Sequence, residues 1–297
     1  MGALTTFELA PALRPAKIDK TATMKRAELH TQLQAAHRRV GVWRDRKPDV
    51  GDCRERRILF YFEILNRFGL LRKGVRLMDL GGGFSYFAPL AIELGPETIL
   101  VDDFAGGGGL ELQESAVEAK AILERMRTRG IQIHTMDILK SPLPAETGSI
   151  DIATCFHSME HWHSSPKPVL QELQRVVRPG GYLLLAGPNA LNLRKRITAV
   201  FGKSNLSPLA HWYDPPVFRG HVREPVVSEF CQMLEWNHFD VRGIWGRNFM
   251  GGEGAGMMAL PAWLRHHISD GSEPFMKVIP SLCSDIHAIG QRRLDGR

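Results

Sequence analysis

Cysteine is scarce in this chain, and long apolar runs are missing. The four cysteines, at positions 53, 155, 231 and 283, stand alone without C-x-x-C spacing. That excludes a disulfide framework and argues against a structural zinc site. No apolar stretch approaches the roughly 18 residues that span a bilayer, and the N-terminus lacks a charged-then-apolar leader pattern. We therefore expect a cytoplasmic protein without a transmembrane segment.

Charge is distributed unevenly along an otherwise ordinary globular composition. Residues 1–76 hold 17 Lys and Arg against 8 Asp and Glu, and the remainder holds 21 against 24. A basic arm can meet nucleic acid, an anionic membrane surface or a phosphorylated substrate, or it can simply be solvated. The aromatics of this arm, Phe60, Tyr61 and Phe68, have the spacing of a packed helix face. This spacing argues against nucleic-acid binding. A solvated face is the preferred interpretation of the basic region, and peripheral membrane contact through it stays open.

The stretch Val75–Ser85, V-R-L-M-D-L-G-G-G-F-S, is the organising feature of the chain. It begins as an apolar run, ends in an acid and passes into three glycines before a helical pattern. Glycines allow positive φ and let backbone N–H groups approach a ligand closely. Because position 86 is Tyr, the motif is not the G-x-G-x-x-G of a dinucleotide fold. We expect Asp79, Gly81, Gly82 and Gly83 to form a cradle for a nucleotide-like cofactor.

Strand and helix patterns alternate for more than a hundred residues after Val75. The expected strands are 75–80, 98–101, 131–136, 149–155, 182–186, 239–245 and 285–290. The expected helices are 25–39, 54–68, 86–94, 111–129, 168–177, 191–200 and 225–237. Such alternation predicts an α/β fold whose parallel sheet is built from βαβ units.

Four segments are expected. Residues 1–70 are a basic, mainly helical extension, and residues 71–190 are the cofactor-binding core. Residues 191–281 hold lid insertions together with late core elements at 225–247, and residues 282–297 are a final strand and tail.

Acidic residues follow three successive expected strands. Asp79 ends the first, Asp102 the second and Asp137 the third. Open α/β sheets bind ligands at the carboxyl ends of their strands. A carboxylate there can accept from both ribose hydroxyls, which suits Asp102, and Asp137 could accept from an adenine amino group.

With these motifs in order, residues 70–245 resemble the class I S-adenosylmethionine-dependent methyltransferases. The resemblance rests on Met78–Gly83, Ile150–Ala153, Met159–His161, Arg178–Gly181 and Pro188–Asn189. It implies a Rossmann-like class I fold, a mostly parallel seven-stranded sheet flanked by helices, and S-adenosyl-L-methionine as cofactor.

The resemblance also implies roles for single residues. Gly81 and Gly83 would hold the methionyl part, Asp102 the ribose, and Asp137 with Ile138 the adenine. Asp103, Met136 and Phe156 complete the expected cofactor site. Ser85 is a departure, because many members have a third glycine there.

Histidines cluster directly after the fourth expected strand. An oxygen nucleophile needs a base or a Lewis acid, and histidine can take a proton near neutral pH. We take His157, His161 and the more distant His221 as candidate catalytic residues, with a purely structural role as the alternative.

The spacing His157-x-x-Glu160-His161 also has metal-ligand character. It resembles the E-x-x-E-H element by which small-RNA 2′-O-methyltransferases and some quinone O-methyltransferases hold a divalent ion. Here His replaces the first Glu, which favours a softer metal, and His221 could supply a fourth ligand. Because Glu-His also occurs in metal-free relatives, we prefer a base to a metal.

The acceptor is indicated by residues 188–241 and 280–287. These are similar to methyltransferases encoded among polysaccharide and lipid-linked glycan biosynthesis enzymes, which implies a sugar hydroxyl as acceptor. Segments 190–224 and 248–281 would form a lid over it. The candidate acceptor contacts are Glu160, Trp212, Tyr213, Arg219 and Arg223, because Arg pairs with phosphate or carboxylate and aromatic rings stack on sugars.

Other functions stay open from the sequence. Within enzymes, the rival is a quinone, polyketide or other small-molecule O- or N-methyltransferase. A protein directed to RNA by its basic arm and a cofactor-binding scaffold are rivals of other kinds. A homodimer is also considered.

Overall fold

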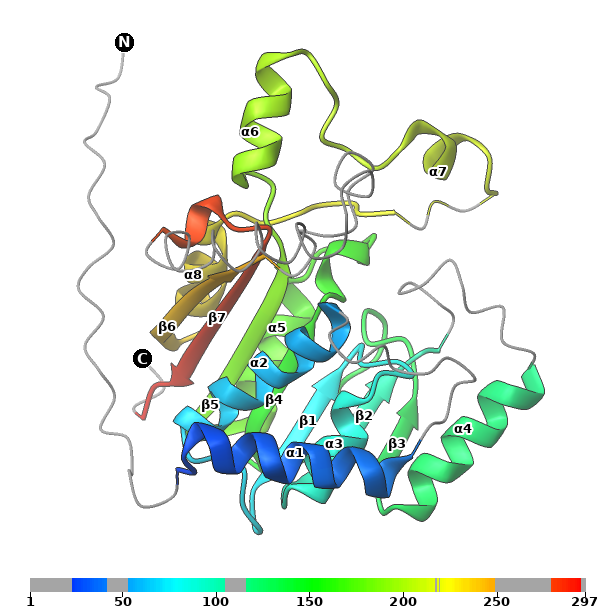
Figure 1. Cartoon of the computed structure of the whole chain (residues 1–297), viewed down its shortest axis with the longest axis vertical. Helices are drawn as coiled ribbons and strands as arrows, with labels where there is room; N and C mark the ends of the chain where they lie inside the picture. Colours follow the sequence, from blue (N-terminus) through cyan, green and yellow to red (C-terminus); the bar gives the residue numbers. More distant parts are fainter. Residues whose placement is uncertain are drawn as a thin grey trace.

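The computed structural model describes residues 23–41, 53–104, 116–216, 218, 220–248 and 279–294. At its centre lies one seven-stranded sheet with the strand order β3-β2-β1-β4-β5-β7-β6, flanked by helices (Figure 1). Over the residues described, no helix is both long enough and apolar enough to cross a membrane.

The strands confirm the expected sheet. Their bounds are β1 Arg76–Leu80, β2 Glu97–Asp102, β3 Gln132–Thr135, β4 Ile150–Phe156, β5 Val177–Pro188, β6 Phe239–Arg247 and β7 Asp285–Arg292. Strands β1 to β5 pair in parallel. Only β7 runs antiparallel to its neighbours, β5 and β6. The sheet is therefore mostly parallel, as the resemblance implied, with β7 inserted between two strands that run the other way.

The helices also fall close to the expected ranges. Their bounds are α1 Arg26–Val40, α2 Cys53–Arg67, α3 Phe87–Glu93, α4 Ala116–Thr128, α5 Lys167–Val176, α6 Leu193–Val200, α7 Leu209–Tyr213 and α8 Val227–Trp236. There are also two 3₁₀ turns: η2 Met159–His161 lies between β4 and α5, and η3 Pro280–Leu282 precedes β7. The short helix α7 lies where a loop was expected. Strand β5 begins five residues before the expected position, because Val177 already pairs with Ile150 across an irregularity in the register.

Two hydrophobic clusters cover the two faces of the sheet. Because successive strand side chains point to opposite faces, Leu77 of β1 lies in the cluster with α2, while its neighbour Met78 lies in the cluster with α5 and α8. Both side chains are fully buried. Both faces of the sheet are therefore covered, which leaves the loops at the carboxyl ends of its parallel strands as the place for a ligand.

Candidate functional site

The glycine turn between β1 and α3 requires glycine at each position. Gly81 and Gly83 have φ values of +67° and +53°, which side-chain-bearing residues rarely adopt. At Gly82 the limit is space, because an added Cβ would lie 2.0 Å from Asp79 Oδ2. The turn therefore presents bare backbone next to a carboxylate.

Asp79, at the end of β1, is a buried carboxyl group with one unused oxygen. Thr154 Oγ1 donates to Oδ1 at 2.8 Å, while Oδ2 has no hydrogen-bond partner. Burial raises the pKa of Asp79 to about 7, and the bond from Thr154 opposes that rise. A buried polar atom without a partner is costly. The free oxygen beside the turn fits the ammonium group of the expected cofactor.

Asp102, at the end of β2, ties the turn to the neighbouring strand. Its Oδ2 accepts from the Gly83 N–H at 2.9 Å, and its Oδ1 accepts from the Phe104 N–H at 2.6 Å. Burial raises the pKa of Asp102, and these two bonds oppose the rise. Each oxygen keeps a further lone pair, so the carboxylate can still accept from a ribose diol. Its neighbour Asp103 is exposed.

The residues after β3 form a turn that is held by its own side chains. Asp137 accepts from the Leu139 N–H at 2.9 Å and pairs with Lys140 Nζ at 2.8 Å. The bond from Lys140 lowers the pKa of Asp137. Met136 and Ile138 are half-buried against the cluster on the α5 face. The adenine contacts of these residues stay predictions.

Phe156, the last residue of β4, packs against the N-terminal extension. Its ring stacks on Tyr61 of α2, with 3.8 Å between centroids and 10° between planes. The side chain thus belongs to the packing between α2 and the sheet. Its contact with the cofactor stays a prediction.

Ser158 joins the glycine turn to the histidine cluster. An added Cβ on Gly81 would lie 2.0 Å from Ser158 Oγ, and Trp162 Nε1 donates to the same hydroxyl at 3.1 Å. The loop after β4 therefore rests directly on the glycine turn. Sequence reasoning missed Ser158, although its place inside the histidine motif was a usable signal.

His157 lies between two buried carboxylates. Its Nδ1 is 3.4 Å from Glu160 Oε1 and its Nε2 is 3.4 Å from Asp285 Oδ1. Glu160 and Asp285 are 2% and 3% exposed. His157 therefore links the loop after β4 to the start of β7. Asp285 begins β7 far along the chain, and nothing in the sequence pointed to it.

Glu160 is buried yet remains the charged form. Burial alone would raise its pKa, but hydrogen bonding and charge from His157, with a contribution from His161, lower it overall. Its carbonyl oxygen accepts from the Val222 N–H at 2.7 Å. That bond anchors the returning segment that carries His221.

The structure brings together three of the expected residues, Glu160, His161 and His221. The rings of His161 and His221 are 4.9 Å apart, and His161 Nδ1 is buried without a hydrogen-bond partner. One ligand atom from each of the three lies within 4.8 Å of the others. A carboxylate with two imidazoles can bind a divalent ion such as zinc or iron, or it can move a proton.

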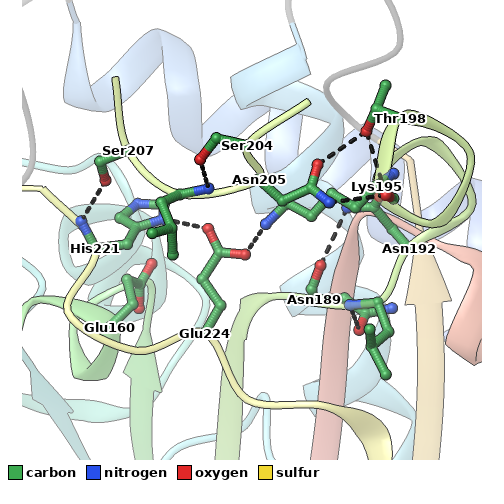
Figure 2. Close-up of polar contacts among 12 residues, drawn as sticks. Glu160, Asn189, Asn192, Lys195, Thr198, Ser204, Asn205, Ser207, His221 and Glu224 are labelled. Carbon is green, nitrogen blue, oxygen red and sulfur yellow. Dashed lines mark hydrogen bonds and ion pairs between the residues drawn. The ribbon is translucent and has the colours of Figure 1, made fainter. Parts of the chain in front are cut away.

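Two residues that the sequence reasoning did not select lie beside His221: Glu224 stands between the His221 ring and the amine of Lys195 (Figure 2). His221 Nδ1 is 2.7 Å from Glu224 Oε1, and Lys195 Nζ pairs with Glu224 Oε2. Because a carboxylate only accepts, Nδ1 carries the proton and Nε2 keeps its lone pair. Burial lowers the pKa of His221. Burial, with a further contribution from the charge of Arg194, lowers the pKa of Lys195 to about 8, while the charge of Asp285 opposes that fall.

The expected acceptor contacts outside this cluster are more dispersed. Trp212 and Tyr213 lie on α7 and are 64% and 76% exposed. The guanidinium of Arg223 pairs with Glu229 at the start of α8. Arg219 lies outside the described residues, as does nearly all of the expected lid segment 248–281. Acceptor binding by these residues stays a prediction.

Comparison with known proteins agrees with this geometry. A sequence family described as "Methyltransferase domain" matches residues 53–242, more than half of the chain. The chain is 32% identical over 122 residues to a tRNA 5-carboxymethoxyuridine methyltransferase of Escherichia coli, covering 40% of this chain and 42% of that protein. It is 28% identical over 130 residues to a ubiquinone biosynthesis O-methyltransferase of Cupriavidus pinatubonensis, covering 43% and 47%.

A longer match is a Mycolicibacterium smegmatis protein named "Probable S-adenosylmethionine-dependent methyltransferase". The two are 28% identical over 190 residues, which cover 64% of this chain and 60% of that protein. The chain thus spans less than two thirds of the length of each of these three relatives.

Among solved structures, the YcgJ protein of Bacillus subtilis has the same fold. It superposes with a TM-score of 0.50 at 18% sequence identity, over 80% of this chain and 99% of that one. The family match, the strand order with its antiparallel β7, and the glycine turn point the same way. This chain belongs to the class I S-adenosylmethionine-dependent methyltransferases.

Proposed function

We propose that this chain transfers a methyl group from S-adenosyl-L-methionine to a hydroxyl of a sugar, glycan or glycan-lipid precursor. One observation carries the chemistry. His221, whose pKa is lowered by burial and whose Nδ1 is held by Glu224, lies in a cluster with Glu160 and His161. Ser158 connects that cluster to the glycine turn.

The bound cofactor supplies a methyl group on a sulfonium, already reactive toward a well-placed oxygen. In the proposed site, Asp79 Oδ2 accepts from the ammonium group and Asp102 accepts from the ribose hydroxyls. His221 Nε2 would take the proton of the acceptor hydroxyl as that oxygen receives the methyl group that the sulfonium supplies. Glu224 and Glu160 stabilise the imidazolium that results.

The sugar acceptor is supported by the resemblance of residues 188–241 and 280–287 to methyltransferases of glycan biosynthesis. Trp212 and Tyr213 supply exposed aromatic faces of the kind that stack on sugar rings. A quinone or other small-molecule acceptor is the rival, favoured by the match to a ubiquinone biosynthesis O-methyltransferase. An RNA acceptor is favoured only by the match to a tRNA methyltransferase.

A screen with radiolabelled S-adenosyl-L-methionine tests the reaction and the acceptor class. Calorimetry first measures cofactor binding to the wild type, to Asp102→Asn and to the control Glu97→Gln, at the opposite end of β2. We expect Asp102→Asn to weaken binding at least tenfold, because Asn keeps one acceptor oxygen and loses one charge-assisted bond, which contributes about 1.5–3 kcal/mol. Glycans, lipid-linked glycans, quinones and tRNA are then offered as acceptors, and transfer to quinones or tRNA alone would refute the glycan assignment. Binding of cofactor without transfer to any acceptor would indicate a scaffold.

A divalent metal ion is the second candidate for activating the hydroxyl. The convergence of Glu160, His161 and His221 within 4.8 Å favours it, and the unpaired His161 Nδ1 is a suitable ligand atom. A metal held there would act as a Lewis acid on the acceptor oxygen. Metal analysis of the purified protein, with activity measured before and after chelation, distinguishes a metal ion from a histidine base. Stoichiometric metal, together with activity that chelation removes and the ion restores, would show that the metal activates the hydroxyl.

A further inference from the structure

Large apolar side chains are concentrated on the segment that carries α6 and α7. Within the described part of the chain, fourteen large hydrophobic residues are exposed, and nine of them lie between positions 191 and 213. They are Leu191, Leu193, Ile197, Val200, Phe201, Leu206, Leu209, Trp212 and Tyr213. Exposed apolar side chains this concentrated in one segment indicate a surface that binds a partner or a membrane. We call residues 191–213 the apolar tip.

The apolar tip lies at the end of the molecule that carries the histidine cluster. Helix α6 follows the carboxyl end of β5 and projects away from the sheet, and α7 lies beyond the same end (Figure 1). Lys195 of α6 pairs with Glu224, which holds His221. The apolar tip is therefore linked to the histidine cluster through Lys195 and Glu224.

The charge of the apolar tip indicates what covers it. The segment 191–213 contains no Asp or Glu, and Arg194, Arg196 and Lys203 are exposed. The fourth cation, Lys195, is buried against Glu224 and does not contribute. Surfaces that combine Lys and Arg with Trp, Phe and Leu bind the headgroup region of anionic membranes. The central part of a protein–protein interface is instead depleted of charge.

The aromatic residues of α7 fit the same surface. Trp212 and Tyr213 are adjacent and mostly exposed. Each combines an apolar ring with a polar N–H or O–H, so both residue types are enriched at membrane–water interfaces. We propose that residues 191–213 dock this chain onto an anionic lipid bilayer. The docking requires neither cofactor nor acceptor, so it is tested independently of the proposed reaction.

Vesicle flotation with the full chain tests the docking. The vesicles contain phosphatidylcholine with phosphatidylglycerol, or phosphatidylcholine alone. The decisive pair is Val200→Glu in the apolar tip and Val117→Glu on α4, because the two valines are 82% and 77% exposed and the charge change is identical. We expect wild type and Val117→Glu to float with anionic vesicles. Val200→Glu should bind about tenfold more weakly, because burial of a valine side chain contributes roughly 1.5 kcal/mol.

A charge-neutralising pair checks the electrostatic part without touching the apolar side chains. Lys203→Gln should bind anionic vesicles about fivefold more weakly, since one lysine near such a surface contributes about 1 kcal/mol. Lys120→Gln on α4, also exposed, should bind like the wild type. Matching thermal melting curves for all four variants would show that folding is intact.

Three results would overturn the proposal. Absence of wild-type flotation would exclude membrane docking. Equal weakening by Val200→Glu and Val117→Glu would assign binding to overall charge, including the basic N-terminal region. If Val200→Glu instead converts a dimer to a monomer in light scattering, without changing flotation, the apolar tip is a contact between two copies of this chain.

Discussion

His221 Nδ1 lies 2.7 Å from Glu224 Oε1, and Lys195 pairs with the other oxygen of the same carboxylate. This row of imidazole, carboxylate and ammonium sets the tautomer of His221 and leaves Nε2 free to accept a proton. It also ties α6 to the segment that follows α7. The same contact therefore supports both the proposed base and the position of the apolar tip.

Replacing Glu224 should reduce both stability and turnover, and a second substitution should separate the two effects. Glu224→Ala leaves the buried Lys195 unpaired, which we expect to cost about 3–5 kcal/mol of unfolding free energy. Lys195→Met with Glu224→Ala should recover most of that stability. Turnover should stay about a hundredfold low in the double variant, because His221 is no longer oriented. Urea unfolding and kcat are the measurements, and recovery of kcat together with stability would show that Glu224 is only structural.

Activity should depend on pH through the neutral form of His221. Because burial lowers the pKa of His221 from its usual 6.5, the imidazole is neutral and able to accept a proton at pH 7. We expect kcat/KM to rise with pH, with the midpoint of the rise below pH 6.5, and then to level off. In Glu224→Gln the rise should move to lower pH, because the carboxylate that favours the imidazolium is gone. An unmoved pH profile in Glu224→Gln would mean that another residue is the base. The same conclusion would follow if the wild-type pH profile were kept in His221→Gln and lost in His211→Gln, the control at an exposed histidine.

Asp79 should make the protein without cofactor less stable as pH rises. The pKa of Asp79 in the folded chain is about 7 against 3.8 for the free side chain. The folded state therefore holds an extra proton between these values, and the associated stability is present below about pH 4 and lost as pH rises through 7. The loss amounts to at most about 4 kcal/mol.

Asp79→Asn should remove this dependence in urea unfolding at pH 5 and pH 8. It should also weaken cofactor binding, most strongly above pH 7, where the wild-type carboxylate is ionised and can pair with an ammonium group. The same slope of stability with pH in both proteins would contradict the burial argument.

Gly81→Ala should abolish cofactor binding, and two further variants separate the steric clash from the backbone strain that this substitution introduces. The new Cβ would meet Ser158 Oγ at 2.0 Å and Cβ at 2.5 Å, in a backbone with positive φ. Gly74 has a similar φ of +80° with nothing within 4 Å of an added Cβ, so Gly74→Ala reports the backbone strain alone. We expect Gly74→Ala to lose roughly 1 kcal/mol of stability and to keep cofactor affinity.

Adding Ser158→Gly to Gly81→Ala should restore part of the affinity in calorimetry, because it removes the colliding atoms. Affinity that stays absent in this pair would mean that the β4 loop does not rest on the turn as described.

Local sequence patterns were sufficient to predict much of the fold of this protein. The alternation of short apolar strands with helices predicted all seven strands, because period and turn residues act over neighbouring positions. The glycine turn and the acids at the ends of β1 and β2 were found for the same reason. Tyr86 in the place of a glycine was enough to exclude a dinucleotide motif.

The candidate catalytic site was decided by tertiary structure. Glu224 and Lys195 meet His221 only because the chain leaves β5, forms α6 and α7, and returns over the β4 loop. Asp285 reaches His157 only because β7 inserts antiparallel beside β5. Such contacts join residues far apart in the chain, and their geometry depends on packing that no local pattern encodes. The sequence thus selected the residues expected to hold the methyl donor, while the fold alone assembled the groups proposed to act on the acceptor.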